Sequence, residues 1–145
     1  MPAMQQDTSI DDGRIRVTSG TPWEARVGYS RAIRTGPFVF VTGTMAADET
    51  GAIVHPDDAG AQAAHVFQKI RRALEAAGSR MEDVVRTRMY VTDIAEQGAV
   101  GAAHAAAFGH VRPCATMVQV GPLAAPDAKV EIEVDAVIDA ALPSG

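Results

Sequence analysis

Two segments alternate strictly between apolar and polar residues, a pattern typical of β-strands with one buried face. The longer one covers residues 129–138 (KVEIEVDAVI), where every second residue from Val130 to Ile138 is apolar and three of the residues between them are acidic. Residues 84–93 (VVRTRMYVTD) alternate in the same way and place Arg88 on the polar side. Both segments are therefore predicted to lie in a sheet whose second face is polar and charged.

Shorter runs predict further strands. Residues 14–20 (RIRVTSG) are expected to form a strand that leads into a loop through Pro22 and Trp23. Residues 28–44 (GYSRAIRTGPFVFVTGT) hold two β-type runs on either side of Thr-Gly-Pro, a combination that favours a hairpin turn. Residues 114–120 (CATMVQV) predict one more strand.

Two helices are expected between these strands. Residues 57–77 have apolar side chains at helical spacing, and Gly78 is a natural stop. Asp93 is expected to start a second helix that ends at Gly109. The apolar positions of the first helix are Ala63, Val66, Phe67, Ile70, Leu74 and Ala77.

This order of elements predicts an α+β fold, in which two helices pack on one face of a mixed sheet. The chain has 145 residues, of which 47% are hydrophobic, and this suits a single globular domain. We expect a flexible leader over residues 1–13 and one domain over residues 14–140. The polar second face of the sheet favours association between subunits.

Composition narrows the function classes. No apolar run approaches the roughly 20 residues that a membrane helix needs, and the polar start is unlike a targeting peptide. A single cysteine, Cys114, excludes an intrachain disulfide and suits the reducing cytoplasm. The net charge of −5 argues against nucleic acid as a partner. A basic cluster is expected to be a solvated helix face plus one strand; its members are Lys69, Arg71, Arg72, Arg80, Arg86 and Arg88.

Four separated blocks, GYSRAIRTGPFVFVTGT, VVRTRMYVTD, FGHVRPCATMVQV and KVEIEVDAV, resemble the Rid family of reactive-intermediate deaminases, also called YjgF-like. The resemblance covers residues 14–139. It implies a chorismate-mutase-like fold, a homotrimer, and a small-molecule cleft between neighbouring subunits. Its best-known members hydrolyse enamines and imines such as 2-aminoacrylate, and neither a cofactor nor a metal is implied.

The resemblance assigns a site residue by residue. Tyr29 corresponds to the aromatic residue of the family's early block, and Thr42 and Gly43 correspond to its hydroxyl residue and glycine. Glu131 corresponds to the glutamate of the closing block and is the expected catalytic residue, which orients or deprotonates water. The alternatives are a strand carboxylate paired with an arginine for Glu131, a loop-packing role for Tyr29, and an ordinary strand end at Thr42 and Gly43.

The strand at residues 112–120 departs from the family pattern. Ala115 stands where deaminating members have an arginine, and Met117 stands where they have a cysteine. An arginine at this place would bind a substrate carboxylate through two hydrogen bonds, whereas alanine provides neither charge nor donor. The substrate is therefore expected to be larger or less anionic than 2-aminoacrylate. Val118 and Val120 are expected in the core.

Arg88 and Arg112 are candidates to replace the missing arginine, although an ion pair or a solvated side chain is the simpler interpretation of each. His104 lies on the apolar stripe of the second helix and is a further ligand candidate, against the simpler alternative of a satisfied, partly buried histidine. The histidines show no metal-binding spacing, and His110 with Cys114 is interpreted as packing rather than a catalytic dyad.

Three functions follow in order of preference. The first is a hydrolase that releases ammonia from a small imine, enamine or amino-substituted acid, with Glu131 acting on water. The second is a non-catalytic trimer that binds a small metabolite or a partner protein in the same cleft. The third is an endoribonuclease-like activity, which the acidity of the chain opposes.

Overall fold

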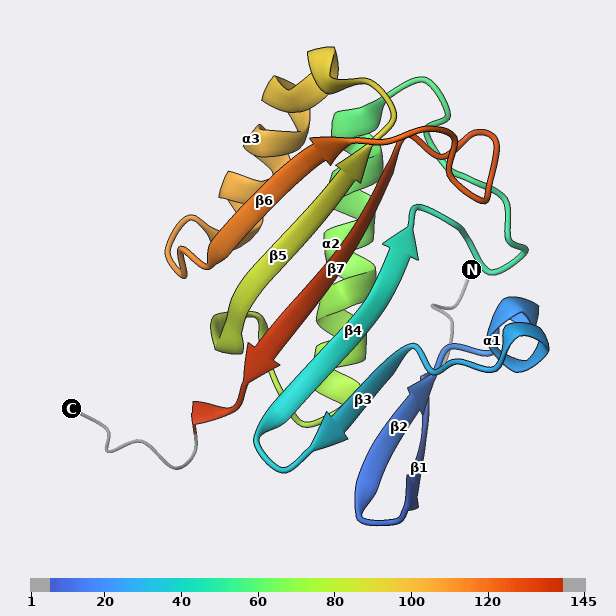
Figure 1. Ribbon diagram of the computed structural model, residues 1–145, viewed down its shortest axis with the longest axis vertical. Helices are drawn as coiled ribbons and strands as arrows, with labels where there is room; N and C mark the ends of the chain where they lie inside the picture. The colour runs from blue at the N-terminus through green and yellow to red at the C-terminus, as the bar shows by residue number, and fades with distance from the viewer. Residues whose placement is uncertain (1–5, 140–145) are drawn as a thin grey trace.

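The computed structural model describes residues 6–139, which form one seven-stranded sheet with helices on one side (Figure 1). The strands are β1 Asp7–Asp11, β2 Arg14–Thr18, β3 Ala32–Thr35, β4 Phe38–Met45, β5 Val84–Val91, β6 Cys114–Gln119 and β7 Val130–Val137. The helices are α1 Pro22–Val27, α2 Ala59–Ala76 and α3 Gln97–Phe108, and two short 3₁₀ turns are η1 Met81–Asp83 and η2 Ile94–Glu96.

The sheet is mixed. Its strand order is β1-β2-β3-β4-β7-β5-β6, and every pair is antiparallel except β5 with β6, which α3 connects. The last strand, β7, lies between β4 and β5. The predicted α+β domain, with its two long helices on one face of a mixed sheet, is therefore confirmed.

The helix α2 covers the centre of the sheet because its sequence provides both a start and an apolar face. Asp58 caps it, since the carboxylate accepts a hydrogen bond from the Ala61 N–H at 2.9 Å. Val66, Ile70 and Leu74 are fully buried against the sheet. The helices α2 and α3 lie behind the sheet in the view of Figure 1, which looks onto the opposite, open face.

Two predictions about the N-terminal region were wrong. Asp7–Asp11 form β1, an edge strand paired with β2, where we expected a flexible leader through residue 13. Residues 1–5 and 140–145 lie outside the described part of the chain. The expected loop through Pro22 is the short helix α1, which starts with that proline and ends at Gly28 in a left-handed conformation with φ 90°. The helix was missed because its six residues are too few to show a period.

The edge strand β6 also differs from expectation. Val118, expected in the core, is 42% exposed because it pairs with Tyr90 on the open face of the sheet. Met117 pairs with the buried Met89 and packs against the core. The register of a strand decides which face a side chain occupies, and a short apolar run gives no sign of that register.

An irregularity in β4 shapes the surface next to β7. The pairing of the two strands shifts between Val41 and Thr44, so Thr42 and Gly43 together stand opposite a single residue of β7. Two residues opposite one residue of the partner strand form a β-bulge, which bends a strand and redirects side chains. It places Thr42 and Gly43 beside the carboxylate of Glu131.

Candidate functional site

A pocket with a cavity volume of ≈ 630 Å³ lies where the end of β4 meets α1, the loop after β4 and the loop before β7. This size is within the usual range of small-molecule sites. Its walls are largely apolar, with Trp23 and Val27 from α1, Ile53 from the loop after β4 and Pro126 from the loop before β7. Four charged residues also line it, namely Arg31, Glu49, Lys69 and Glu131.

Four of the residues named from the sequence come together here. Tyr29, Thr42, Gly43 and Glu131 all line the pocket, although they come from three separate parts of the chain. The loop before β3 supplies Tyr29, the bulge of β4 supplies the next two, and β7 supplies the carboxylate. The pocket therefore combines a phenol, a hydroxyl and a carboxylate on an apolar floor.

Gly43 permits the close approach of Glu131. A Cβ at position 43 would lie 2.6 Å from the Oε2 atom of Glu131, too short for any real contact. The absence of a side chain at this position thus leaves the carboxylate its place against the bulge.

The carboxylate of Glu131 is suited to accept a proton. Burial, together with the charge of Glu133, raises its pKa above the ordinary value of 4.5, and the guanidinium of Arg31 partly opposes this. Among residues 6–139 it makes no ion pair. Within the chain, Glu131 therefore does not pair with Arg86 or Arg88, and a pair of this kind at a subunit contact stays a prediction.

Arg31 anchors the back of the pocket through a buried polar network. Its guanidinium pairs with Glu24 at 3.3 Å and donates to the Gly43 carbonyl at 3.1 Å and to Thr44 Oγ1 at 3.2 Å. It also lies 5.8 Å from the ring centre of Tyr29. One side chain thus joins α1, the aromatic residue and the bulge.

Glu24, the partner of Arg31, is held ionised. Burial by itself would raise its pKa, but hydrogen bonds from Ser19, Thr18 and Thr21 outweigh this and lower it. Thr18 and Thr21 each donate to the carboxylate at 2.8 Å. The buried charge is therefore fully hydrogen-bonded, as a buried ion requires.

Lys69 reaches the pocket from α2. Its ammonium donates to the carbonyl oxygens of Met45 and Ala47, both at 3.0 Å. Burial lowers its pKa to about 8, and the charges of Arg31 and Arg72 act in the same direction. The expectation that Lys69 belongs to a solvated helix face was wrong, since its amine is held inside this pocket.

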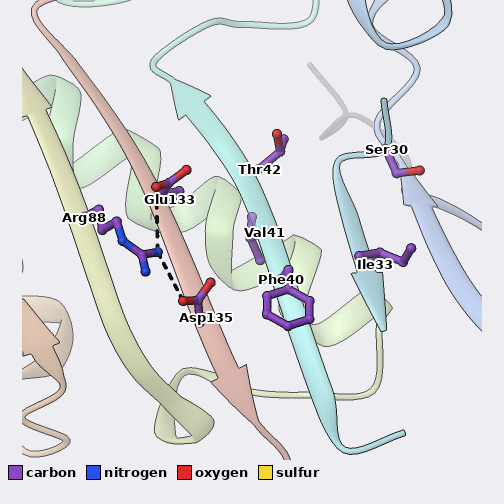
Figure 2. Close-up of a pocket in the computed structure, with 8 residues that line it drawn as sticks. All are labelled: Ser30, Ile33, Phe40, Val41, Thr42, Arg88, Glu133 and Asp135. Atoms are coloured by element: carbon purple, nitrogen blue, oxygen red, sulfur yellow. Dashed lines mark hydrogen bonds and ion pairs between the residues drawn. The ribbon is translucent and has the colours of Figure 1, made fainter. Parts of the chain in front are cut away.

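Arg88 lies on the open face of the sheet and not in this pocket. Figure 2 shows it between two carboxylates of β7, 3.1 Å from Asp135 and 3.7 Å from Glu133. These three residues line a second cavity of ≈ 330 Å³ with Phe40, and Thr42 lines both cavities. Within one chain, the guanidinium of Arg88 forms ion pairs with these two carboxylates.

The remaining candidates lie away from the pocket. His104 makes a hydrogen bond of 2.9 Å with Thr87 Oγ1, and burial lowers its pKa, which favours the neutral ring. Ala115 pairs with Thr87 on β6, on the edge of the sheet farthest from β1, and is exposed. Arg112 is exposed and has a left-handed backbone with φ 55°. Met117 packs against the core.

Two charged residues that line the pocket were not named as site candidates from the sequence. Arg31 stands two positions after Tyr29, and Lys69 directly precedes the buried Ile70 on α2, where Arg71 directly follows it. Neither has a local signal that predicts the pocket. No group of three or more metal-ligating side chains occurs in residues 6–139, and none of the helices described is long and apolar enough to cross a membrane.

Comparisons with known proteins agree on one family. The sequence model described as Endoribonuclease L-PSP matches residues 19–138. The 3-aminoacrylate deaminase RutC of Acinetobacter baylyi is 36% identical over 118 residues, which are 81% of this chain and 92% of that protein.

Solved structures show the same likeness. Rv2704 of Mycobacterium tuberculosis, a member of the YjgF/YER057c/UK114 family, is 47% identical with a TM-score of 0.79, covering 86% of this chain and 99% of that one. The YjgF gene product of E. coli is 30% identical with a TM-score of 0.68, covering 75% of this chain and 87% of that one.

Proposed function

Because the chain belongs to the YjgF/RidA family, described in its sequence model as Endoribonuclease L-PSP, we propose that it is a hydrolase that releases ammonia from a small imine or enamine. The observation that carries the proposal is the position of Glu131, a partly buried carboxylate with a raised pKa on the wall of a ≈ 630 Å³ pocket. A relative at 36% identity bears the name 3-aminoacrylate deaminase, which is the same class of reaction.

The chemistry asks for a proton acceptor next to an electrophilic carbon. Protonation of an enamine by solvent at its β-carbon gives the iminium ion, and the oxygen of water then adds to the iminium carbon while the C=N electron pair moves to nitrogen. Glu131 accepts the proton that water loses. The amino group of the carbinolamine then takes up the proton held by Glu131, and the C–N bond breaks as the hydroxyl oxygen forms the C=O bond and releases its proton to solvent. One water is consumed, and the products are a carbonyl compound and ammonia.

The other pocket residues orient the substrate. The phenol of Tyr29 and the hydroxyl of Thr42 line the same cavity as the carboxylate and offer hydrogen bonds to the substrate, and the apolar wall with Trp23 excludes water from the reacting atoms. Arg31 fixes the bulge that positions Thr42.

We propose further that the protein is a homotrimer with the cleft between subunits. The open face of the sheet supports this, because it exposes large apolar side chains beside charged ones, with Phe38 48% and Phe40 43% exposed. Ala115 and Met117 lie on β6, so only a second copy of the chain brings them next to the pocket. Since Ala115 lacks a guanidinium, the way in which this protein binds its substrate differs from that of members with arginine there. The single cysteine suits a reaction in the cytoplasm.

The test is ammonia release from freshly generated 2-aminoacrylate and 3-aminoacrylate by the wild type and by Glu131→Gln. We expect kcat to fall by about 100- to 10,000-fold in the variant, the usual contribution of general-base catalysis. Glu75→Gln is the matched control, because it removes an exposed carboxylate on α2 and should leave the rate unchanged. Equal rates for wild type and Glu131→Gln would contradict the role of Glu131, and no ammonia from either substrate would contradict the hydrolase.

The second candidate is a non-catalytic protein that binds a small metabolite in the same pocket. It is favoured by one observation, the absence of a donor at Ala115. Deaminase activity that appears only in Ala115→Arg would support it, as would thermal stabilisation by a ligand that is not turned over. An endoribonuclease activity ranks third, because the net charge is −5.

A further inference from the structure

The pocket holds two cations that differ in how their charge is balanced. Arg31 is paired with the buried carboxylate of Glu24. Lys69 has no carboxylate within ion-pair distance among residues 6–139, and only backbone carbonyls accept its hydrogen bonds. The positive charge of Lys69 is therefore the one that the pocket leaves available to a ligand.

The position of the ammonium is fixed by the fold. An ammonium has three N–H donors, and two of them bind the carbonyls of Met45, at the end of β4, and Ala47, just after it. The stem rises from α2 beside the buried Ile70. The third donor has no acceptor among the described residues, and the side chain lines the cavity that Glu131 also lines.

We propose that Lys69 binds the carboxylate of the substrate and so takes over the task of the arginine that is absent at Ala115. This inference rests on the proposed hydrolase function and adds the substrate class: an imine or enamine of an oxo acid that still carries its carboxylate. The carboxylate of the substrate is then bound by Lys69 on α2 instead of by an arginine on β6, and the substrate keeps its negative charge.

The other charged groups of the pocket do not attract an anionic substrate, so its binding requires the positive charge of Lys69. Glu49 and Glu131 line the same cavity and would repel an anionic substrate, and Arg31 is already neutralised by Glu24. A carboxylate at Lys69 offsets the cost of a partly buried ammonium, whose pKa burial lowers to about 8. The other charged groups that act on this amine are Arg72 and His65 on α2 and Asp48 in the loop after β4.

The experiment compares Lys69→Met, Lys69→Arg and the control Arg72→Met. Arg72 lies one turn further along α2, is exposed and does not line the pocket, so its removal changes the net charge equally. Two quantities are measured for each protein: KM and kcat for 2-aminoacrylate, and the Kd of pyruvate, the keto acid that this substrate yields. Pyruvamide, which has no carboxylate, is the neutral probe, and thermal melting shows that each variant is folded.

We expect Lys69→Met to raise both KM and the Kd of pyruvate by about 10- to 100-fold, the scale of a hydrogen bond to a charged group, with a smaller change in kcat. Lys69→Arg retains most of the affinity, and pyruvamide binds equally to all the proteins. Arg72→Met keeps the KM and the Kd of pyruvate at pH 7, but the pH dependence of its pyruvate binding moves to higher pH, because the charge of Arg72 lowers the pKa of Lys69. In the wild type, pyruvate binding weakens as the pH rises through about 8, where the free amine loses its proton, and it is independent of pH in this range in Lys69→Met.

These measurements distinguish a failure of the inference about Lys69 from a failure of the hydrolase proposal. If the wild type turns over the substrate and Lys69→Met has the same KM, the inference about Lys69 is wrong and the hydrolase stands. If the wild type releases no ammonia, the hydrolase proposal fails, and the pyruvate titration decides on Lys69 independently. Pyruvate affinity that is equal in wild type and Lys69→Met, or absent from both, overturns the inference.

Discussion

Two clusters of an arginine with carboxylates, one between α1 and the start of β3 and the other on the open face of the sheet, differ in burial and in hydrogen bonding. Arg31 and Glu24 are 8% and 4% exposed, and the carboxylate accepts further hydrogen bonds from three hydroxyl side chains. Arg88 on the open face is 40% exposed, and its partners Glu133 and Asp135 are 31% and 30% exposed (Figure 2).

Burial is what separates the roles of the two clusters. If a buried ion pair loses one member, the other is left as a desolvated charge without a partner. Arg31 therefore stays paired with Glu24 and holds the bulge at Gly43 in a fixed position relative to α1. A half-exposed pair gains little in stability, because water competes for both partners. Its charges remain free to meet another surface, which suits contact between subunits.

The largest effect on stability is expected when the cation of the buried cluster is removed. Arg31→Met leaves the Glu24 carboxylate buried without its cation, and we expect the free energy of unfolding to fall by about 3–5 kcal/mol. Urea denaturation measures the change. The bulge at Gly43 also loses its donor, so activity falls in parallel.

The double variant Glu24→Gln/Arg31→Met is the control for this effect. It removes both charges, so it should recover part of the stability lost in Arg31→Met. A loss below about 1 kcal/mol in the single variant would show that the buried pair behaves like the exposed one, and the contrast between the clusters would fail.

A medium effect is expected from Arg88→Met. The free energy of unfolding, compared at one protein concentration, should change by no more than about 1 kcal/mol, because the removed pairs are half in water. Light scattering over a dilution series should instead show a weaker assembly, since Glu133 and Asp135 then repel at the proposed contact. An assembly as stable as that of the wild type contradicts the assignment of this cluster to the interface.

The smallest effect concerns pH. The pKa of Glu24 is lower in the fold than its ordinary value of 4.5, so its contribution to stability is present above that value and is lost as the pH falls through the folded pKa. Unfolding curves between pH 7 and pH 3 should show a steeper loss for wild type than for Glu24→Gln. Parallel curves would mean that the hydrogen bonds and the ion pair of Glu24 do not stabilise its ionised form in the fold.

The strands and long helices are predictable because each has enough residues to show a period. The alternation of β7 and the apolar stripe of α2 appear in the structure at the expected residues. Within β5 the alternation breaks at its start, where Val84 is buried and Val85 is 46% exposed, because the pairing with β7 shifts there. A shift in register has no signature in the sequence of one strand.

The pocket is predictable only in part. Resemblance pointed to Tyr29, Thr42, Gly43 and Glu131, and these four residues line one cavity. Lys69 could not be found in this way, because its role depends on α2 crossing behind β4, so that its amine meets two carbonyls more than 20 residues away in the chain. Such long-range contacts are products of the tertiary fold and not of any local pattern.

The place of β7 in the sheet has a consequence for how the protein is made. Among the strands of residues 6–139, β7 is synthesised last, yet it is the strand that pairs with both β4 and β5 and so joins the two halves of the sheet. A nascent chain that lacks residues 130–137 exposes the unpaired edge of β4, a surface prone to aggregation that chaperones protect. Glu131 lies on that joining strand, so the pocket is complete only when β7 has paired with β4.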